Sequence, residues 1–210
     1  MTSPDEIARA VEAGADAVGV IVAQSPRRVP PSSLRALAAA VPPFVSKIGV
    51  LAGEQNDDLA QALQEFGFTL QFSGDESAEY CEHVTRGLPY VKAFHLEPGV
   101  STTPSDLRLR AYVHATWMFD SRVGGRNGGT GVAFPWRAIE AIAAVRPVIV
   151  SGGLTPENVG ACVRAVRPYA VDVRSGIETG CQKDLEKMDA FVRAVREADA
   201  DRSLESAYLP

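Results

Sequence analysis

The chain has 210 residues, of which 46% are hydrophobic and 22% are charged, and its formal net charge is −5. This length is typical of one domain with a sizeable core, and the lack of a long basic run argues against a nucleic-acid partner. The three cysteines have no metal-ligand spacing and favour a reducing compartment over a disulfide framework. No apolar stretch approaches the roughly 20 residues that span a bilayer, and the N-terminus has no apolar signal region. We therefore expect a cytoplasmic protein without a metal site or a membrane partner.

The first element that the sequence predicts is a capped helix over residues 4–13. Ser3 is placed to cap it, Pro4 occupies the first helical position, and Glu6 completes the Ser-x-x-Glu pattern of a capping box. Apolar residues then recur at helical spacing up to Gly14. The chain thus begins on a helix, with no strand ahead of it.

Short apolar runs alternate with amphipathic segments along the rest of the chain. The expected strands are 16–22, 47–51, 69–72, 90–94, 115–119, 147–151 and 170–174. The expected helices are 4–13, 32–41, 56–66, 76–86, 104–112, 136–145, 156–166 and 184–198. Such alternation predicts a parallel sheet covered by helices, either a doubly wound open sheet or a (β/α)8 barrel. A barrel needs eight strands and eight helices, and the strand that is missing from this count would precede the first helix.

The domain organisation is expected to be simple. Residues 1–198 form one predicted domain, and residues 199–210 form a polar, frayed tail. Segment 121–135 is predicted to be a long glycine-rich loop, and loops of that length inside a compact domain are usually functional. A barrel without its first strand would leave two unpaired parallel edges, at 16–22 and 170–174. We therefore expect that the tail at 203–209 or a second chain covers the gap, or that the first helix is displaced.

The residues that directly follow the predicted strands are the candidates for chemistry, because barrel active sites lie at the carboxyl ends of the strands. Three glycine-rich stretches occupy such positions and are suited to bind a phosphate through backbone N–H groups. One glycine pair could simply shape a tight turn, but three such stretches together favour phosphate. The candidate phosphate-binding residues are Gly129 and Gly131 in GGTG, Gly152 and Gly153 in SGGLTPEN, and Ser175 and Gly176 in RSGIETG.

Charged residues near the same strand ends complete the candidate site. Asp120 follows an apolar strand, and burial there would raise the pKa of its carboxyl toward neutrality, as a general acid or base requires; a structural cap or salt bridge is the alternative. Arg27 could bind a carboxylate, whereas Arg28 is better explained as a solvated charge. Asp172 alternates with apolar neighbours, so we expect it to face inward with a partner. His95 is the one histidine at the same strand ends, but a structural role fits it better.

These motifs, in this order and spacing, resemble phosphoribosylanthranilate isomerase over essentially the whole chain up to about residue 198. The resemblance rests on EAGADAVG, SPRRV, PPFVSKIGV, LQFSGDE, VKAF, Asp120 with GGTG, VSGGLTPENV, RPYAVDVRSGIE and KD. It implies a (β/α)8 barrel, here missing its first β-strand, that acts in tryptophan biosynthesis as a monomer or homodimer without a cofactor. The implied reaction is an Amadori rearrangement of N-(5-phosphoribosyl)anthranilate, a phosphorylated small molecule.

The resemblance also implies roles for particular residues. Asp120 matches the general acid that protonates the ribose ring oxygen, and Arg27 matches the arginine that contacts the anthranilate carboxylate. Asp172 matches an aspartate close to the substrate. Gly152, Gly153, Ser175 and Gly176 match the phosphate loops.

The sequence departs from the family pattern at several positions. Ser73 stands where the family usually has His, Arg174 where it has Ser, and Pro135 where it has Asp. The family's first strand carries a cysteine that acts as general base, and here Met1 coincides with the end of that motif. We therefore expect impaired turnover, with Met1 an internal methionine of a longer natural chain.

Two alternative functions remain open from the sequence. A non-catalytic homologue that binds sugar phosphates would keep the glycine-rich loops without turnover. A related phosphoribosyl isomerase of histidine biosynthesis would carry phosphate loops in both halves, and residues 50–55 supply only one glycine in the matching half.

Overall fold

The protein is described by a computed structural model in which two compact units can be distinguished. The structure describes residues 1–53, 55–96, 103, 105–123, 126–127, 135–180 and 182–207. The first unit comprises Met1–Ala93 with Ala111–Thr116, and the second comprises Phe94–Arg110 with Trp117–Pro210.

The first unit opens on the predicted helix, α1 (Pro4–Ala13). The Ser3 hydroxyl accepts a hydrogen bond from the N–H of Glu6 at 3.2 Å, and Gly14 ends the helix in the left-handed conformation with a φ of 97°. The Glu6 carboxylate accepts from the N–H of Thr2 at 2.6 Å, one residue before the position that a standard capping box uses. The sequence prediction of a capped helix is confirmed.

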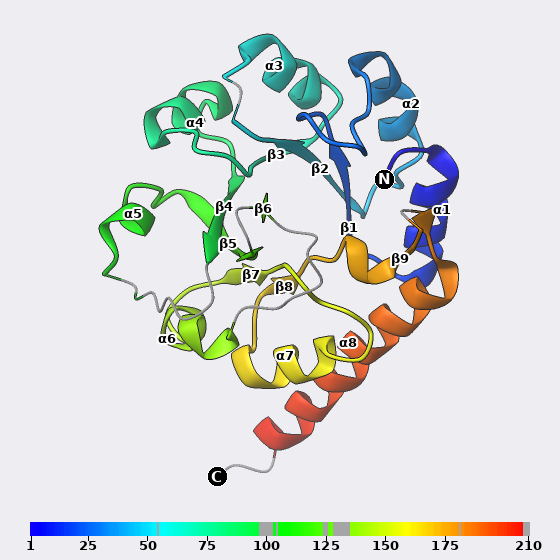
Figure 1. The fold of residues 1–210 in the computed structure, drawn as a ribbon, viewed down its shortest axis with the longest axis vertical. Coiled ribbons are helices and arrows are strands. Elements are labelled where there is room, and N and C mark those ends of the chain that lie inside the picture. The colour runs from blue at the N-terminus through cyan, green and yellow to red at the C-terminus, as the bar shows by residue number, and fades with distance from the viewer. Residues whose placement is uncertain are drawn as a thin grey trace. The chain divides into compact units, whose positions relative to one another are not determined.

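Four strands of the first unit pair in parallel in the order β1-β2-β3-β4, with helices between them (Figure 1). The strands are β1 (Ala17–Ile21), β2 (Ser46–Leu51), β3 (Thr69–Phe72) and β4 (Tyr90–Leu96). The intervening helices are η1 (Pro31–Ser33), α2 (Leu34–Ala39), α3 (Asp57–Glu65) and α4 (Ala78–Thr85). Leu63 on α3 packs directly on Gly49 of β2. A Cβ atom at Gly49 would lie only 2.7 Å from the methyl carbons of Leu63. Apolar side chains that alternate along the strands therefore meet apolar helix faces, as the sequence pattern predicts.

The edge of β1 that faces away from β2 accepts two hydrogen bonds from its own unit. The terminal ammonium of Met1 donates to the carbonyl of Gly19, and the N–H of Val29 donates to the carbonyl of Ile21 at 2.8 Å. The N–H of Val22 points to the other side of the strand and donates to the carbonyl of Val50 in β2 at 3.1 Å. Residues close to β1 in sequence thus cap part of this edge.

The second unit contains the end of β4 and a parallel ladder in the order β5-β7-β8. Strand β6 pairs with β5 in the antiparallel direction and forms a hairpin with it. The long C-terminal helix α8 packs along α7 (Figure 1). The elements are α5 (Leu107–Arg110), β5 (Ala115–Val123), β6 (Arg126–Asn127), η2 (Trp136–Ile139), α6 (Glu140–Ala143), β7 (Val148–Val150), α7 (Val159–Val166), β8 (Ala170–Val171), η3 (Ser175–Ile177), β9 (Glu178–Thr179), β10 (Gln182–Lys183) and α8 (Leu185–Ala207).

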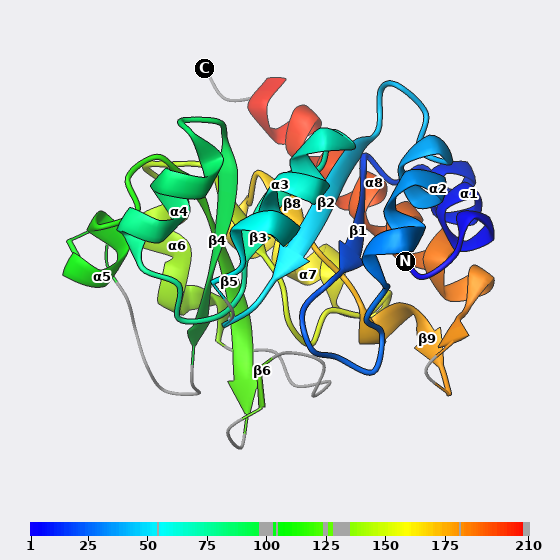
Figure 2. The same ribbon diagram turned by 90° about the horizontal axis from the view of Figure 1, so that it is seen from above.

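Two features of the second unit differ from the sequence prediction. The segment 121–135 does not begin as a loop, because β5 continues to Val123 and pairs with β6 through Arg122↔Asn127 and Val123↔Arg126 (Figure 2). Helix α8 extends to Ala207, well past residue 198, so the residues that we expected to cover the edge of 16–22 are helical up to that point. Residues 199–207 contain four charged residues and one large apolar residue, Leu204, so the apolar pattern of a helix is weak there.

Candidate active site

Asp120 lies at the point where β5 leaves its parallel neighbour. The ladder between β5 and β7 ends at Phe119↔Val150, and the N–H of Ser151 donates to the carbonyl of Phe119 at 2.8 Å. Asp120 is therefore the first residue beyond the parallel pairing, although the strand itself continues into the hairpin. Its side chain is 17% exposed, and Ser121 beside it is buried.

The environment of Asp120 favours the protonated carboxyl. Burial is the main reason that the pKa of Asp120 lies above its ordinary value, and the neighbouring carboxylate of Asp172 raises it further. His95 and Arg174 act in the opposite direction, as does a hydrogen bond from the backbone of Ser121. The Nδ1 atom of His95 lies 3.8 Å from Oδ2 of Asp120. A carboxyl group that keeps its proton to a higher pH than usual is better suited to donate it to a bound molecule.

The loop that follows β7 touches Asp120. Gly152 has a φ of 82°, and a Cβ atom at this position would overlap the Oδ1 atom of Asp120 and the backbone nitrogen of Ser121. Only glycine combines this left-handed backbone with so close an approach. The structure therefore brings together two residues that the sequence analysis selected separately, the aspartate and the first glycine of SGGLTPEN.

The rest of the same loop is held by Asn158, the residue before α7. Its Oδ1 atom accepts from the N–H of Thr155 at 2.8 Å, and its Nδ2 atom donates to the carbonyl of Gly153 at 2.8 Å. Gly153 also has a positive φ, of 67°. The N–H groups of Gly152 and Gly153 are the candidate donors to an anion. Because Asn158 closes a turn over residues 155–158, α7 begins later than the sequence predicts.

The loop that follows β8 packs against this one. A Cβ atom at Gly176 would overlap the carbonyl oxygen of Leu154, so the two loops are in backbone contact. Ser175 is the first residue of the short helix η3. In the hairpin that follows, the ammonium of Lys183 donates a hydrogen bond of 3.2 Å to the carbonyl of Arg174. Asp120, Gly152, Gly153, Ser175 and Gly176 therefore belong to one connected arrangement.

Asp172 is exposed, so its charge is not buried, and its inward orientation stays a prediction. Strand β8 comprises only Ala170–Val171, so Asp172 already lies beyond the regular ladder. It does have a partner, since its carboxylate accepts a hydrogen bond from the Ser151 hydroxyl at 2.9 Å. That hydrogen bond connects the ends of β7 and β8.

The remaining predicted site residues lie elsewhere or outside the described residues. Arg27 belongs to the first unit, in the turn after β1, where its N–H donates to the Ser25 hydroxyl at 3.2 Å. Arg28 is exposed, as predicted. Gly129 and Gly131 lie outside the described residues.

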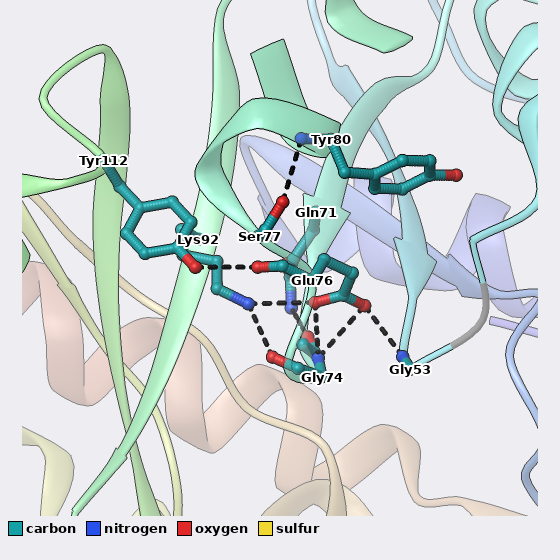
Figure 3. Close-up of polar contacts among 9 residues, drawn as sticks. Gly53, Gln71, Gly74, Glu76, Ser77, Tyr80, Lys92 and Tyr112 are labelled. Carbon is teal, nitrogen blue, oxygen red and sulfur yellow. Dashed lines mark hydrogen bonds and ion pairs between the residues drawn. The ribbon is translucent and has the colours of Figure 1, made fainter. Parts of the chain in front are cut away.

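The first unit contains a buried polar cluster that the sequence analysis missed (Figure 3). Glu76 is 2% exposed and Lys92 is 3% exposed, and their charged atoms lie 2.9 Å apart. The Glu76 carboxylate also accepts from the N–H groups of Gly53 at 2.8 Å and Gly74 at 3.0 Å, which follow β2 and β3. The Tyr112 hydroxyl donates to the Glu76 carbonyl at 2.7 Å, and the Lys92 ammonium lies 5.5 Å from the Tyr112 ring centroid. A lysine inside the apolar run VKAF was the available signal, because a buried charge requires a partner.

The described residues include two cysteines away from this site. Cys81 and Cys162 are buried on helices, and burial raises the pKa of each thiol to about 12. In the part of the chain that the structure describes, no group of three or more His, Cys, Asp or Glu residues is arranged to hold a metal ion. No helix among those residues is long and apolar enough to cross a membrane.

The fold and the site define the class of protein. Among the described residues, seven strands pair in parallel and alternate with helices, and the polar residues gather where the strands end, as in (β/α)8-barrel enzymes. The family model described as N-(5'phosphoribosyl)anthranilate (PRA) isomerase matches residues 1–194. The chain belongs to this family, and the match does not favour the histidine-pathway alternative.

Individual relatives agree with this assignment. N-(5'-phosphoribosyl)anthranilate isomerase of Desulforudis audaxviator is 41% identical over 201 residues, covering 94% of this chain and 96% of the relative. The enzyme of the same name from Pseudomonas fluorescens is 41% identical over 203 residues, covering 95% and 94%. The crystal structure of phosphoribosyl anthranilate isomerase from Thermotoga maritima superimposes with a TM-score of 0.82 at 28% identity, covering 94% of this chain and 96% of that one. A further structure, with a TM-score of 0.78 at 28% identity over 94% of this chain and 95% of that one, contains reduced 1-(o-carboxyphenylamino)-1-deoxyribulose 5-phosphate.

Proposed function

We infer that this chain is an isomerase of tryptophan biosynthesis that converts N-(5-phosphoribosyl)anthranilate into 1-(2-carboxyphenylamino)-1-deoxyribulose 5-phosphate. Its family membership supports the reaction. The observation that supports the site most directly is the contact between Gly152 and Asp120, because it places a candidate proton donor beside a candidate phosphate loop. Both ends of a phosphorylated sugar can then be bound within one region of the second unit.

The loops after β7 and β8 bind the substrate phosphate in this proposal. Gly152 and Gly153 offer backbone N–H groups, and Ser175 and Gly176 lie on the adjoining loop. An anion beside such groups is stabilised without a metal ion, since several N–H dipoles point to it. Gly129 and Gly131, which the sequence analysis adds to this set, belong to the same proposal.

Asp120 acts as the general acid that opens the ribose ring. Its carboxyl donates a proton to the ring oxygen while the C1–O bond breaks, and the nitrogen lone pair of the anthranilate stabilises the resulting cation. Burial supports this role, because it keeps the proton on the carboxyl at a higher pH than in water. The proposal for the described residues is limited to this ring-opening step.

The substrate carboxylate and the sugar require further contacts. Arg27 is assigned to the anthranilate carboxylate, because a guanidinium can donate two parallel hydrogen bonds to it. Asp172 is assigned to a contact with the substrate, and its hydrogen bond with Ser151 holds it in place.

The cellular setting is part of the same proposal. We expect the protein to act in the cytoplasm, on a small molecule, as a monomer or homodimer and without nucleic acid. A relative from Thermotoga maritima is described as a dimeric phosphoribosylanthranilate isomerase from which monomers were generated.

Binding and turnover are tested separately. Isothermal titration of the reduced product analogue should show binding by the wild-type chain and by S175A, and much weaker binding by S175D, because a carboxylate on η3 repels the phosphate. Asp120→Asn should bind the analogue but lose about 10²–10⁴-fold in turnover. Unchanged binding by S175D would contradict the phosphate site. Binding by the wild-type chain without any turnover would fit both a non-catalytic sugar-phosphate-binding homologue and an isomerase that lacks its general base.

A further inference from the structure

His95 and Asp120 lie next to each other at the ends of β4 and β5. Their side chains are 13% and 17% exposed, and the Nδ1 atom of His95 is 3.8 Å from Oδ2 of Asp120. Both residues belong to the second unit. At this distance and burial, a charge on the imidazole acts strongly on the carboxyl group, because little water screens it.

Two other charged groups act on Asp120. Asp172, after β8, opposes ionisation of Asp120, and Arg174, in the same loop, favours it. Asp172 is exposed and accepts a hydrogen bond from the Ser151 hydroxyl at 2.9 Å. Histidine is the residue type whose charge changes between about pH 5 and 8. Of these neighbours, His95 is the one whose Nδ1 atom lies 3.8 Å from the Asp120 carboxylate.

We propose that His95 is a positioning residue that controls whether Asp120 carries its proton. With a neutral imidazole beside it, the buried carboxyl of Asp120 retains the proton. With an imidazolium beside it, the carboxylate is stabilised and the proton is released. This inference deepens the proposed function, because it matters for catalysis only if Asp120 is the acid.

The same geometry explains why a histidine suits this position. A permanent cation 3.8 Å away would favour ionised Asp120 at every pH, and a neutral side chain would leave the carboxyl subject to burial and to Asp172 alone. Histidine lies between these limits. A purely structural role would be fulfilled by any side chain of similar size that packs equally well.

The direct test is a titration of Asp120 itself. The carboxyl carbon of Asp120 is followed by ¹³C NMR from pH 3 to 9 in the wild-type chain, in His95→Gln and in His95→Lys, with Asp120→Asn identifying the signal. The midpoint of the Asp120 titration should move to higher pH in H95Q, because glutamine cannot carry a positive charge. It should move to lower pH in H95K, because lysine carries a positive charge throughout this range. His83→Gln is the matched control, because His83 is exposed on α4 in the first unit and should leave the midpoint unchanged.

The outcomes separate this inference from the proposed function. Opposite shifts in H95Q and H95K support it, whereas an unshifted midpoint in folded H95Q overturns it, even if H95K fails to fold. The alkaline limb of kcat/KM should move in the same directions as the NMR midpoint. If Asp120→Asn keeps full turnover, the acid role fails while the NMR shifts still stand. If Asp120→Asn is inactive and the midpoint does not move, only the role of His95 fails.

Discussion

A methyl group on Gly152 would occupy the space of the Asp120 Oδ1 atom. This relationship joins the loop after β7 to the candidate acid on β5, and both residues lie in the second unit. The positive φ of Gly152 makes the contact possible, because it lets the backbone turn sharply right after β7 ends.

We predict that Gly152→Ala lowers the free energy of unfolding by about 2–4 kcal/mol, since it combines backbone strain with overlap in a buried site. Turnover should fall as well, because Asp120 must move. Gly87→Ala is the matched control: its φ of 78° imposes similar strain, but no atom lies within 4 Å of an added Cβ. Urea unfolding of both variants measures the difference, and equal losses would contradict the contact with Asp120.

Replacing the candidate acid should stabilise the fold at neutral pH. The pKa of Asp120 is raised in the folded state, so its contribution to stability is fully present below the unfolded pKa and is lost as the pH rises through the folded value. Asp120→Asn removes this loss, and its free energy of unfolding should exceed that of the wild-type chain at pH 7.5. The advantage should disappear below pH 3, where the carboxyl of Asp120 is protonated in both the folded and the unfolded state.

The control for that experiment is Asp189→Asn, an exposed position on α8. It should change the free energy of unfolding by no more than about 0.5 kcal/mol. A loss of stability in Asp120→Asn at pH 7.5 would show that the carboxylate is better satisfied than its burial indicates.

The cluster around Glu76 should be sensitive to the loss of one charge. Lys92→Met should lower the free energy of unfolding by about 3–5 kcal/mol, because it leaves a buried carboxylate without its cation. Arg9→Ala breaks an ion pair at 2.8 Å on the surface of α1 and should lower it by no more than about 1 kcal/mol. Denaturant unfolding of both variants gives the comparison, and a cost for K92M below that of R9A would rule out a structural role for the buried pair.

The bridge formed by Asn158 should support anion binding. Asn158→Ala removes both hydrogen bonds that hold the turn at Gly153 and Thr155, at a cost of about 1–3 kcal/mol in stability. Asn158→Asp retains an acceptor for Thr155 but replaces the donor to Gly153 with a negative charge. Titration with inorganic phosphate should therefore show weaker binding for N158D than for N158A. The reverse order would mean that the loop does not bind the anion.

Much of the fold follows from local patterns in the sequence. Apolar runs predict all seven parallel strands. Capping residues predict the bounds of α1, which begins after Ser3 and ends before Gly14. These signals are short-range, because propensity, periodicity and capping involve residues within one or two turns. The hairpin of β5 with β6 is an exception, since a glycine-rich segment does not reveal whether its flanks pair.

The sequence alone determined that Asp120, the glycines of SGGLTPEN and Ser175 follow apolar strands, and therefore that they are candidates for one site. Only the tertiary structure decided that Gly152 touches Asp120, that Asp172 is exposed, that His95 lies beside Asp120, and that Glu76 and Lys92 pair inside the first unit. The physical reason is distance along the chain. Burial and charge interactions depend on side chains that are far apart in sequence, and only packing of the strands and loops brings them together.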